Sequence, residues 1–233
     1  MAVSSWTELA QATDWNHPRN KAAAARDGDA FTAMIADRWY GLLHDAIRRH
    51  DPNHLVFGDK LKYDMIPPLL FPVLKKYVDV IMVQDIKENL QDQIAHFSGV
   101  YAGIGKPILN GDCGFSAPDP KKQHLKGFPV GSYNEVGEYY AAFMKGLMNL
   151  PFMIGWHYCG YIEGCAGTRL EAQEGFRDPF GKTHAEVIEH VREANAKADE
   201  WHRASRPLER KMKVPVQDAG EPRDLKSTAP ARR

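Results

Sequence analysis

The chain alternates between stretches in which apolar residues recur at helical spacing and short runs of consecutive apolar residues. Between positions 31 and 47 the apolar side chains fall on one side of a helix, and Asp51-Pro52-Asn53 predicts its end. The same spacing predicts further helices over 6–12, 71–77, 87–105, 133–151 and 184–205.

Runs of consecutive apolar residues lie between the longer helices. They cover 54–59, 78–85, 106–115 and 152–161. Such runs are typical of strands that are buried on both faces, as in a parallel sheet covered by helices. The predicted fold class is therefore α/β, with parallel strands in a (β/α)8 barrel or a doubly wound sheet. No Gly-x-Gly-x-x-Gly or P-loop motif follows any of the runs, which disfavours nucleotide binding.

The patterns divide the chain into three parts. We expect an irregular N-terminal segment over 1–29, a folded region over 30–203 and a tail over 204–233. From Arg203 onward the sequence carries nine Lys or Arg against four Asp or Glu, with several prolines and few large apolar residues. This composition is typical of a solvated, disordered end.

Composition then excludes several classes of protein. Lys and Arg total 30 and Asp and Glu total 30, so the formal net charge of zero disfavours a nucleic-acid partner. No apolar run approaches the length of a membrane span, and the first residues show no signal peptide, which leaves the localisation open. The three cysteines predict reduced thiols, with a Cys159–Cys165 bridge as the alternative.

Candidate functional residues follow each predicted strand. Ligands of parallel α/β folds bind at the carboxyl ends of strands, so these side chains predict one shared pocket. Asp112 lies between glycines, where it could act as a nucleophile, a base or an acceptor for sugar hydroxyls, or simply form a turn. Alternation along a strand predicts that Trp156 and Tyr158 share one face and that His157 lies on the other. The full set is Asp59, Lys60, Gln84, Asp85, Asp112, Trp156, His157 and Tyr158.

Other catalytic chemistries have weaker support. A metal site formed by Asp112, Cys113, His157 and Cys159 is an alternative, but paired Cys or His ligands at metal-binding spacing are absent. A Ser-His-Asp hydrolase would need a Gly-x-Ser-x-Gly turn, which the sequence lacks. We therefore predict no metal.

Several of these segments resemble one family of enzymes. KPILNGDCGF (106–115) resembles the seventh strand of the retaining (β/α)8-barrel glycoside hydrolases of clan A, and FMIGWHYCGY (152–161) resembles their eighth strand. The segments around 46–61 and 77–84 are similar to their fifth and sixth strands. Within the clan, the chain is most similar to agarase-like and β-galactosidase-like enzymes, over about residues 5–203.

This resemblance implies a function and its residues. It implies hydrolysis of O-glycosidic bonds in a polysaccharide, with Asp112 in the place of the nucleophile and Trp156 under the sugar. Asp59, Lys60, Gln84, His157 and Tyr158 are then candidate substrate contacts. Two carboxylates carry this chemistry, so no cofactor is implied.

The sequence departs from the family in two ways. The family has Glu where this chain has Asp112, whose side chain is shorter by one C–C bond of about 1.5 Å. The family's acid/base Glu follows Asn on a fourth strand, whereas the Asn134-Glu135 pair here begins a predicted helix. We therefore expect only strands five to eight, completed by a missing N-terminal half-barrel or a second copy. The alternative function is a carbohydrate-binding pseudoenzyme or a truncated fragment.

Overall fold

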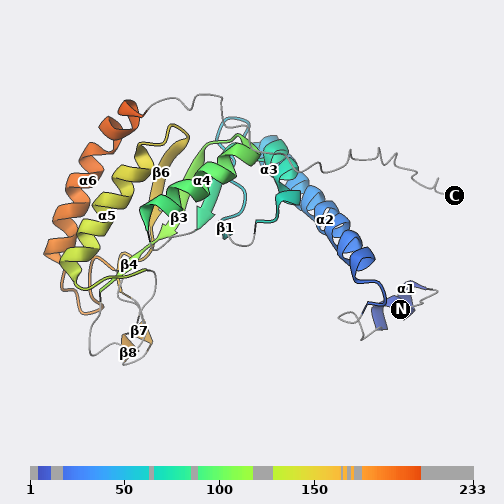
Figure 1. Ribbon diagram of the computed structural model, residues 1–233, viewed down its shortest axis with the longest axis horizontal. Helices are drawn as coiled ribbons and strands as arrows, with labels where there is room; N and C mark the ends of the chain where they lie inside the picture. Colours follow the sequence, from blue (N-terminus) through green and yellow to red (C-terminus); the bar gives the residue numbers. More distant parts are fainter. Residues whose placement is uncertain are drawn as a thin grey trace.

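The computed structural model describes residues 5–11, 18–62, 66–84, 89–117, 128–163, 165–166, 169–170 and 175–205. Its elements follow one another as helix and strand along most of the chain (Figure 1). In order they are α1 (Trp6–Gln11), α2 (Lys21–His50), β1 (Leu61–Lys62), the 3₁₀ turn η2 (Pro68–Leu70), α3 (Phe71–Tyr77), β2 (Ile81–Gln84), α4 (Leu90–Ile104), β3 (Ile108–Cys113), β4 (Phe115–Ser116), β5 (Phe128–Pro129), α5 (Tyr133–Met148), β6 (Met153–Tyr158), β7 (Cys165–Ala166), β8 (Arg169–Leu170) and α6 (Ala185–Ala204).

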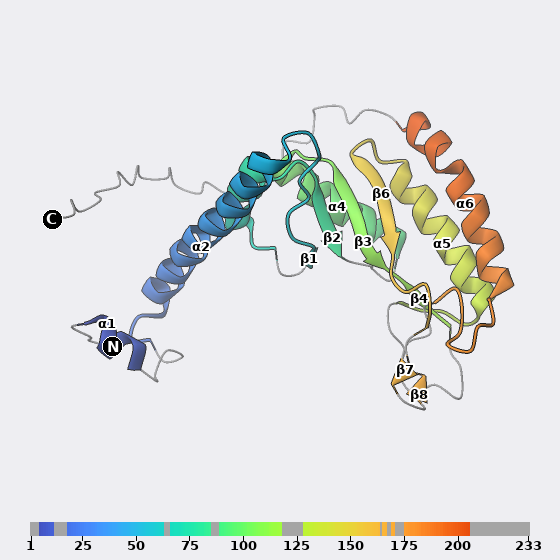
Figure 2. The same cartoon turned by 180° about the vertical axis from the view of Figure 1, so that it is seen from behind.

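The centre of the fold is a four-stranded sheet in the order β1-β2-β3-β6, in which all neighbouring strands are parallel. Helices cover one face of this sheet (Figure 2). Side chains on that face, such as Val83 and Ile108, are fully buried, whereas Met82 and Leu109 on the opposite face are only half-buried. The described part is therefore an arc of a barrel whose inner face is open, as the predicted fold class implies.

Two apolar clusters hold the arc together. One lies between the sheet and α2, α3 and α4, and it includes Leu74, Ile81 and Phe97. The other joins β3 and β4 to α5 and α6, and it includes Phe115 and Met144. Each cluster packs helices against the outer face of the strands, which is how continuously apolar strands are buried in parallel sheets.

The second helix begins earlier than the sequence pattern predicts. α2 spans 30 residues from Lys21, and the Asn20 side chain caps it by accepting the Ala23 amide at 3.0 Å. The expectation of an irregular segment over 1–29 is therefore wrong from Lys21 onward. The alanine-rich first turns form helix without an apolar face, so they carry no hydrophobic period for the sequence analysis to detect.

The first predicted strand is also misplaced. Residues 54–59 form no strand, and β1 is instead the short Leu61–Lys62 segment that pairs with Val83 and Gln84. The Val56 amide donates to Asp79 Oδ2 at 2.8 Å, and Gly58 has a φ of 70° that interrupts an extended chain. Val56 is the buried residue of this run and Leu55 is exposed, so the segment is a tethered loop rather than a strand.

The other predicted elements match the structure closely. α3 has the predicted bounds, while β2, β3 and β6 lie within the predicted apolar runs. Cys113 is buried and Cys159 is half-buried, and the reduced state of the thiols stays a prediction. The predicted tail lies outside the described residues from position 206 onward, and no helix in the described part is long and apolar enough to cross a membrane.

Candidate active site

Three elements bring charged side chains together on the open face of the sheet. Asp112 of β3 forms an ion pair through Oδ2 with Nζ of Lys60, the residue before β1. Its other oxygen, Oδ1, lies 3.2 Å from Nδ1 of His157 on β6. The Asp112 side chain is 18% exposed, against 38% for Lys60 and 64% for His157. The carboxylate therefore lies inside the cluster, with the two basic groups towards solvent.

The backbone at Asp112 has an irregularity that produces this placement. Asn110 is opposite Trp156 and Cys113 is opposite Tyr158, so β3 has one residue more than β6 over this interval. Asp112 takes up the extra residue with a φ of 56°, a left-handed conformation that costs energy for a residue other than glycine. Bulges of this kind frequently redirect a side chain next to an active site.

The glycine before Asp112 is required for close packing. A Cβ built on Gly111 would lie 2.6 Å from Cε of Met82 on the neighbouring strand β2. Only glycine lets the two strands approach at this point without displacing Met82. Packing against Met82 explains the glycine at position 111, and the bulge in β3 explains the placement of Asp112.

The charges around Asp112 favour its ionised form. The hydrogen bond from Lys60 lowers the pKa of the Asp112 carboxyl, partial burial opposes this, and the charge of Lys60 and the bond to His157 lower it further. Asp112 is therefore a carboxylate at neutral pH. An ionised carboxylate on an exposed face can stabilise positive charge or accept hydrogen bonds from a ligand.

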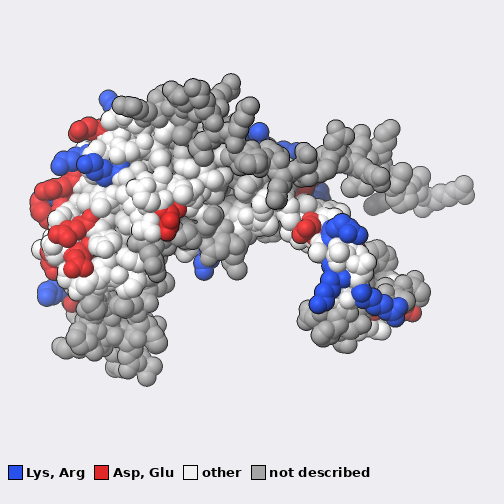
Figure 3. Space-filling model, in the orientation of Figure 1, with Lys and Arg blue, Asp and Glu red and all other residues white. Residues whose placement is uncertain are grey.

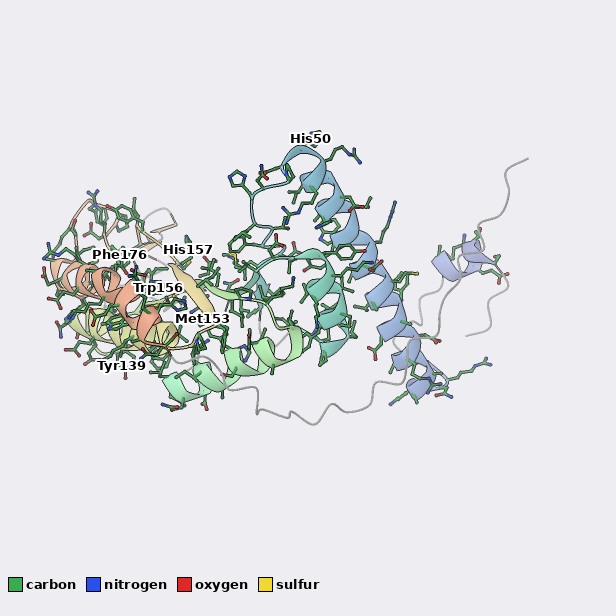
Figure 4. The ribbon with its side chains drawn as sticks, turned by 90° about the horizontal axis from the view of Figure 1, so that it is seen from above. His50, Tyr139, Met153, Trp156, His157 and Phe176 are labelled. Atoms are coloured by element: carbon green, nitrogen blue, oxygen red, sulfur yellow. The ribbon has the colours of Figure 1, made fainter. Side chains whose placement is uncertain are left out.

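Trp156 lies on the opposite face of β6 from His157 (Figure 4). Its Nε1 donates to the Tyr140 hydroxyl of α5 at 2.6 Å, and that hydroxyl donates to Asn195 Oδ1 of α6 at 2.7 Å. Burial raises the pKa of Tyr140 to about 12, so the hydroxyl keeps its proton. The indole thus joins the strand to two helices rather than to the cluster around Asp112.

Tyr158 lies on the same side of the strand as Trp156. Its hydroxyl lies 3.3 Å from the Phe115 amide and 3.2 Å from the Phe115 carbonyl, and its ring stacks on Phe176 at 4.7 Å between centroids. The predicted alternation of side chains along β6 is confirmed. The interpretation of Trp156 and Tyr158 as contacts in the same site as Asp112 is not supported, because both rings pack on the helix-covered side.

Asp59 is placed apart from Asp112, whereas Gln84 lies on the same face of β2 as Met82. Asp59 accepts the Trp39 indole N–H at 3.3 Å, and burial together with the Asp59 charge raises the pKa of Tyr40, so Asp59 lies against α2. Gln84 ends β2 and is half-buried. Asp85 lies outside the described residues.

The Asn134-Glu135 pair has a structural position. Ser132 caps α5 by accepting the Glu135 amide at 3.2 Å, and Glu135 Oε2 in turn accepts the Gly131 amide at 2.6 Å. This reciprocal arrangement is close to a capping box. The pair begins a helix, as the sequence predicts, and does not lie at a strand end.

A buried carboxylate was missed by the sequence analysis. Glu163, whose side chain is fully buried, accepts the Tyr133 hydroxyl at 2.5 Å, and its Oε1 lies 3.2 Å from Nε2 of His184. The rings of Tyr133 and His184 stack at 3.7 Å. The cluster ties the loop after β6 to the first residues of α5 and α6. The sequence carried no signal for it, because Glu163 lies in a stretch without any period.

The candidate metal ligands are separated by the strand. Cys113 is fully buried in the cluster beneath α5, and its Sγ lies 3.6 Å from the His157 carbonyl rather than beside Asp112. Within the described ranges, no group of three His, Cys, Asp or Glu side chains is arranged to hold a metal ion. The cluster that remains on the open face consists of Asp112, Lys60 and His157.

The arrangement of the sheet and its helices is similar to that of enzymes of known structure. The structure of an exo-β-agarase is 24% identical in sequence to this chain and has a TM-score of 0.74. The match covers 88% of this chain and 28% of the agarase chain. The structure of the agarase AgWH50C is 21% identical in sequence and has a TM-score of 0.68. This match covers 79% of this chain and 29% of the agarase chain. The fold is therefore similar to part of the barrels of these enzymes.

Sequence comparison points to the same group. β-Agarase B of Vibrio sp. (strain JT0107) is 22% identical over 178 residues, which are 76% of this chain and 18% of that protein. No protein-family model matches the chain. The chain thus spans less than a third of the agarases described here, and its fold corresponds to one part of their barrels.

Proposed function

We propose that this chain carries the strand-five to strand-eight half of a glycoside hydrolase barrel that hydrolyses O-glycosidic bonds of an agar-type polysaccharide. The observation that carries the proposal is the position of Asp112: a carboxylate on the open face of the sheet, on the strand whose sequence resembles the family's nucleophile strand. The similarity to agarases supports the substrate class.

In this proposal Asp112 is the catalytic carboxylate. It is ionised and partly exposed, so it can stabilise the positive charge that develops on the sugar in an oxocarbenium-like transition state. Lys60 and His157 are the candidate donors to substrate hydroxyls, since both are more exposed than the carboxylate they touch. Trp156 and Tyr158 support the strand from the helix side.

The proposed enzyme also needs the other half of its barrel. One side of α2 exposes a continuous set of large apolar side chains, and Ile154 on β6, the edge strand of the described sheet, is 43% exposed. Exposed apolar patches of this extent mark interaction surfaces. The apolar stripe of α2 consists of Phe31, Met34, Ile35, Trp39, Leu42, Leu43 and Ile47.

The charges on α6 indicate that a distinct half-barrel, rather than a second copy of this chain, covers the apolar stripe of α2. If two copies closed a barrel, α2 of each would meet α6 of the other at the open edges. The exposed side of α6 carries many charges, and Figure 3 shows acidic and basic side chains gathered over it. A charged helix face is a poor match for the apolar stripe, whereas further βα units with apolar helix faces would bury it.

A carbohydrate-binding protein without catalysis is the second candidate function. Both oxygens of Asp112 are held by basic side chains, Lys60 and His157, rather than facing a second carboxylate. Retaining glycosidases need two carboxyl groups about 5–5.5 Å apart. Such a protein would bind saccharide through the same face and leave it intact.

One experiment separates the two functions. The protein that contains both halves of the proposed barrel and its Asp112→Asn variant are incubated with oligosaccharides made from agarose, and both reducing ends and binding are measured. We expect release of reducing ends that Asp112→Asn abolishes, with Asp92→Asn as the control acid on α4. Binding without release would support the second candidate. Neither binding nor release would contradict both.

A further inference from the structure

Lys60 reaches Asp112 across an intervening strand. It immediately precedes β1, Asp112 lies on β3, and β2 lies between these strands in the sheet. The two residues are 52 positions apart in the sequence. The Lys60 side chain therefore extends over the open face of the sheet to reach Oδ2, instead of extending into solvent beside its own strand.

The contact places a basic side chain against each oxygen of Asp112. Lys60 holds Oδ2 and His157 lies against Oδ1, so both carboxylate oxygens face a basic side chain. A carboxylate that attacks a sugar, or accepts its hydroxyl groups, needs at least one oxygen turned towards the substrate. In the arrangement seen here, Lys60 and His157 occupy one acceptor position on each oxygen, and a substrate group that takes either position displaces a basic group.

Lys60 is the group that can move. Its stem has four flexible carbons and its side chain is 38% exposed, so the ammonium can leave into solvent. Asp112 lies on a bulged backbone with a φ of 56°, and its side chain is less exposed than that of Lys60, at 18%. The ion pair also offsets part of the cost of this backbone, because it stabilises the carboxylate where the bulge places it.

We propose that Lys60 is a positioning residue that clamps Asp112 in the resting site and covers part of Oδ2, so that a substrate group takes this position on Oδ2 by displacing the ammonium. This inference rests on the proposed function for its biological meaning, but the clamp itself is a property of the free protein. Once displaced, the ammonium can donate to a substrate hydroxyl. Lys60 and His157 are the titratable groups that lower the pKa of Asp112.

The test compares Lys60→Met with Lys60→Arg in the full chain, and uses Lys62→Met as the matched control. Lys62 is an exposed lysine of β1 two residues away, and its removal leaves the clamp in place. The pKa of the Asp112 carboxyl is followed by carbon-13 NMR. The rate at which a water-soluble carbodiimide couples an amine to Asp112 is followed by mass spectrometry.

We expect Lys60→Met to raise the pKa of Asp112 and to increase the carbodiimide labelling rate several-fold. Lys60→Arg keeps the cation and should retain the lowered pKa, and Lys62→Met should match the wild type in both measurements. A wild-type pKa or a wild-type labelling rate in Lys60→Met would overturn the clamp. Neither readout needs turnover, so an absence of hydrolysis would count against the proposed function and not against the clamp.

Discussion

Nδ1 of His157 lies 3.2 Å from Oδ1 of Asp112, although the two residues are 45 positions apart in the sequence. The contact exists because β3 and β6 are neighbours in the sheet and because the bulge in β3 turns Asp112 towards the open face. The residues on either side of His157 face the helices. One strand therefore contributes a polar group to the site and aromatic rings to the core.

Replacing Trp156 tests the separation of these two faces. Trp156→Phe removes the indole N–H that donates to the Tyr140 hydroxyl. We expect the free energy of unfolding to fall by about 1 kcal/mol, the usual net value of a hydrogen bond, with unchanged saccharide binding. Denaturant unfolding and a binding titration measure the two effects. Weaker saccharide binding at an unchanged free energy of unfolding would show that Trp156 contacts the substrate.

Replacing Gly111 tests whether β2 and β3 need a glycine where they approach closely. Gly111→Ala places a Cβ 2.6 Å from Met82 Cε, so we expect a loss of about 1–3 kcal/mol in the free energy of unfolding, as for other overpacked sites. Combining it with Met82→Ala should cost less than the sum of the two single changes. The control is Gly99→Ala on α4, whose Cβ meets nothing within 4 Å and which should be neutral or stabilising. Equal effects at the two glycines would refute the packing argument.

Replacing Asp79 tests the hydrogen bond to the Val56 amide, which holds the loop found in place of the first predicted strand. It accepts the Val56 amide and pairs with Arg48, and the pKa of its carboxyl is lowered first by the Val56 hydrogen bond and then by Arg48. Because Asp79 is one-third exposed, Asp79→Ala should cost about 1–2 kcal/mol at pH 7, below the full value for charged hydrogen bonds.

The same carboxyl predicts a pH dependence. A pKa that is lower in the folded than in the unfolded chain gives a stabilisation that is complete above the ordinary value of 3.8 and is lost as the pH falls through the folded pKa. Asp79→Asn should therefore show a weaker decline of unfolding free energy below pH 3.8 than the wild type. Parallel declines in both proteins would show that Asp79 does not contribute.

Glu163 tests whether the buried cluster anchors the loop after β6. Glu163→Ala removes the buried carboxylate that accepts the hydrogen bond of the half-buried Tyr133 hydroxyl, and we expect a loss of about 1–3 kcal/mol. Tyr133→Phe should cost less, since it removes the donor as well, and the double variant should cost less than the sum. Additive losses, measured by urea unfolding, would mean that the two groups do not interact.

The sequence by itself determined the succession of elements and most of their bounds. Continuous apolar runs identified β2, β3 and β6, helical spacing identified α3 to α6, and the resemblance at 106–115 identified the strand that carries Asp112. These features are local, because burial on both faces of a strand or on one side of a helix leaves its period in the chain.

Only the tertiary structure decided which of the strand-end residues meet. Lys60 and His157 reach Asp112 because of sheet order and a one-residue bulge, while Asp59 lies against α2 and Trp156 lies against α5. A bulge shifts every later side chain of a strand by one position relative to the neighbouring strand. A loop that is tethered by a hydrogen bond, such as that between Val56 and Asp79, can be as apolar in sequence as a strand. Neither is encoded in a hydrophobic period, so the face on which each candidate residue lies follows from packing between distant segments.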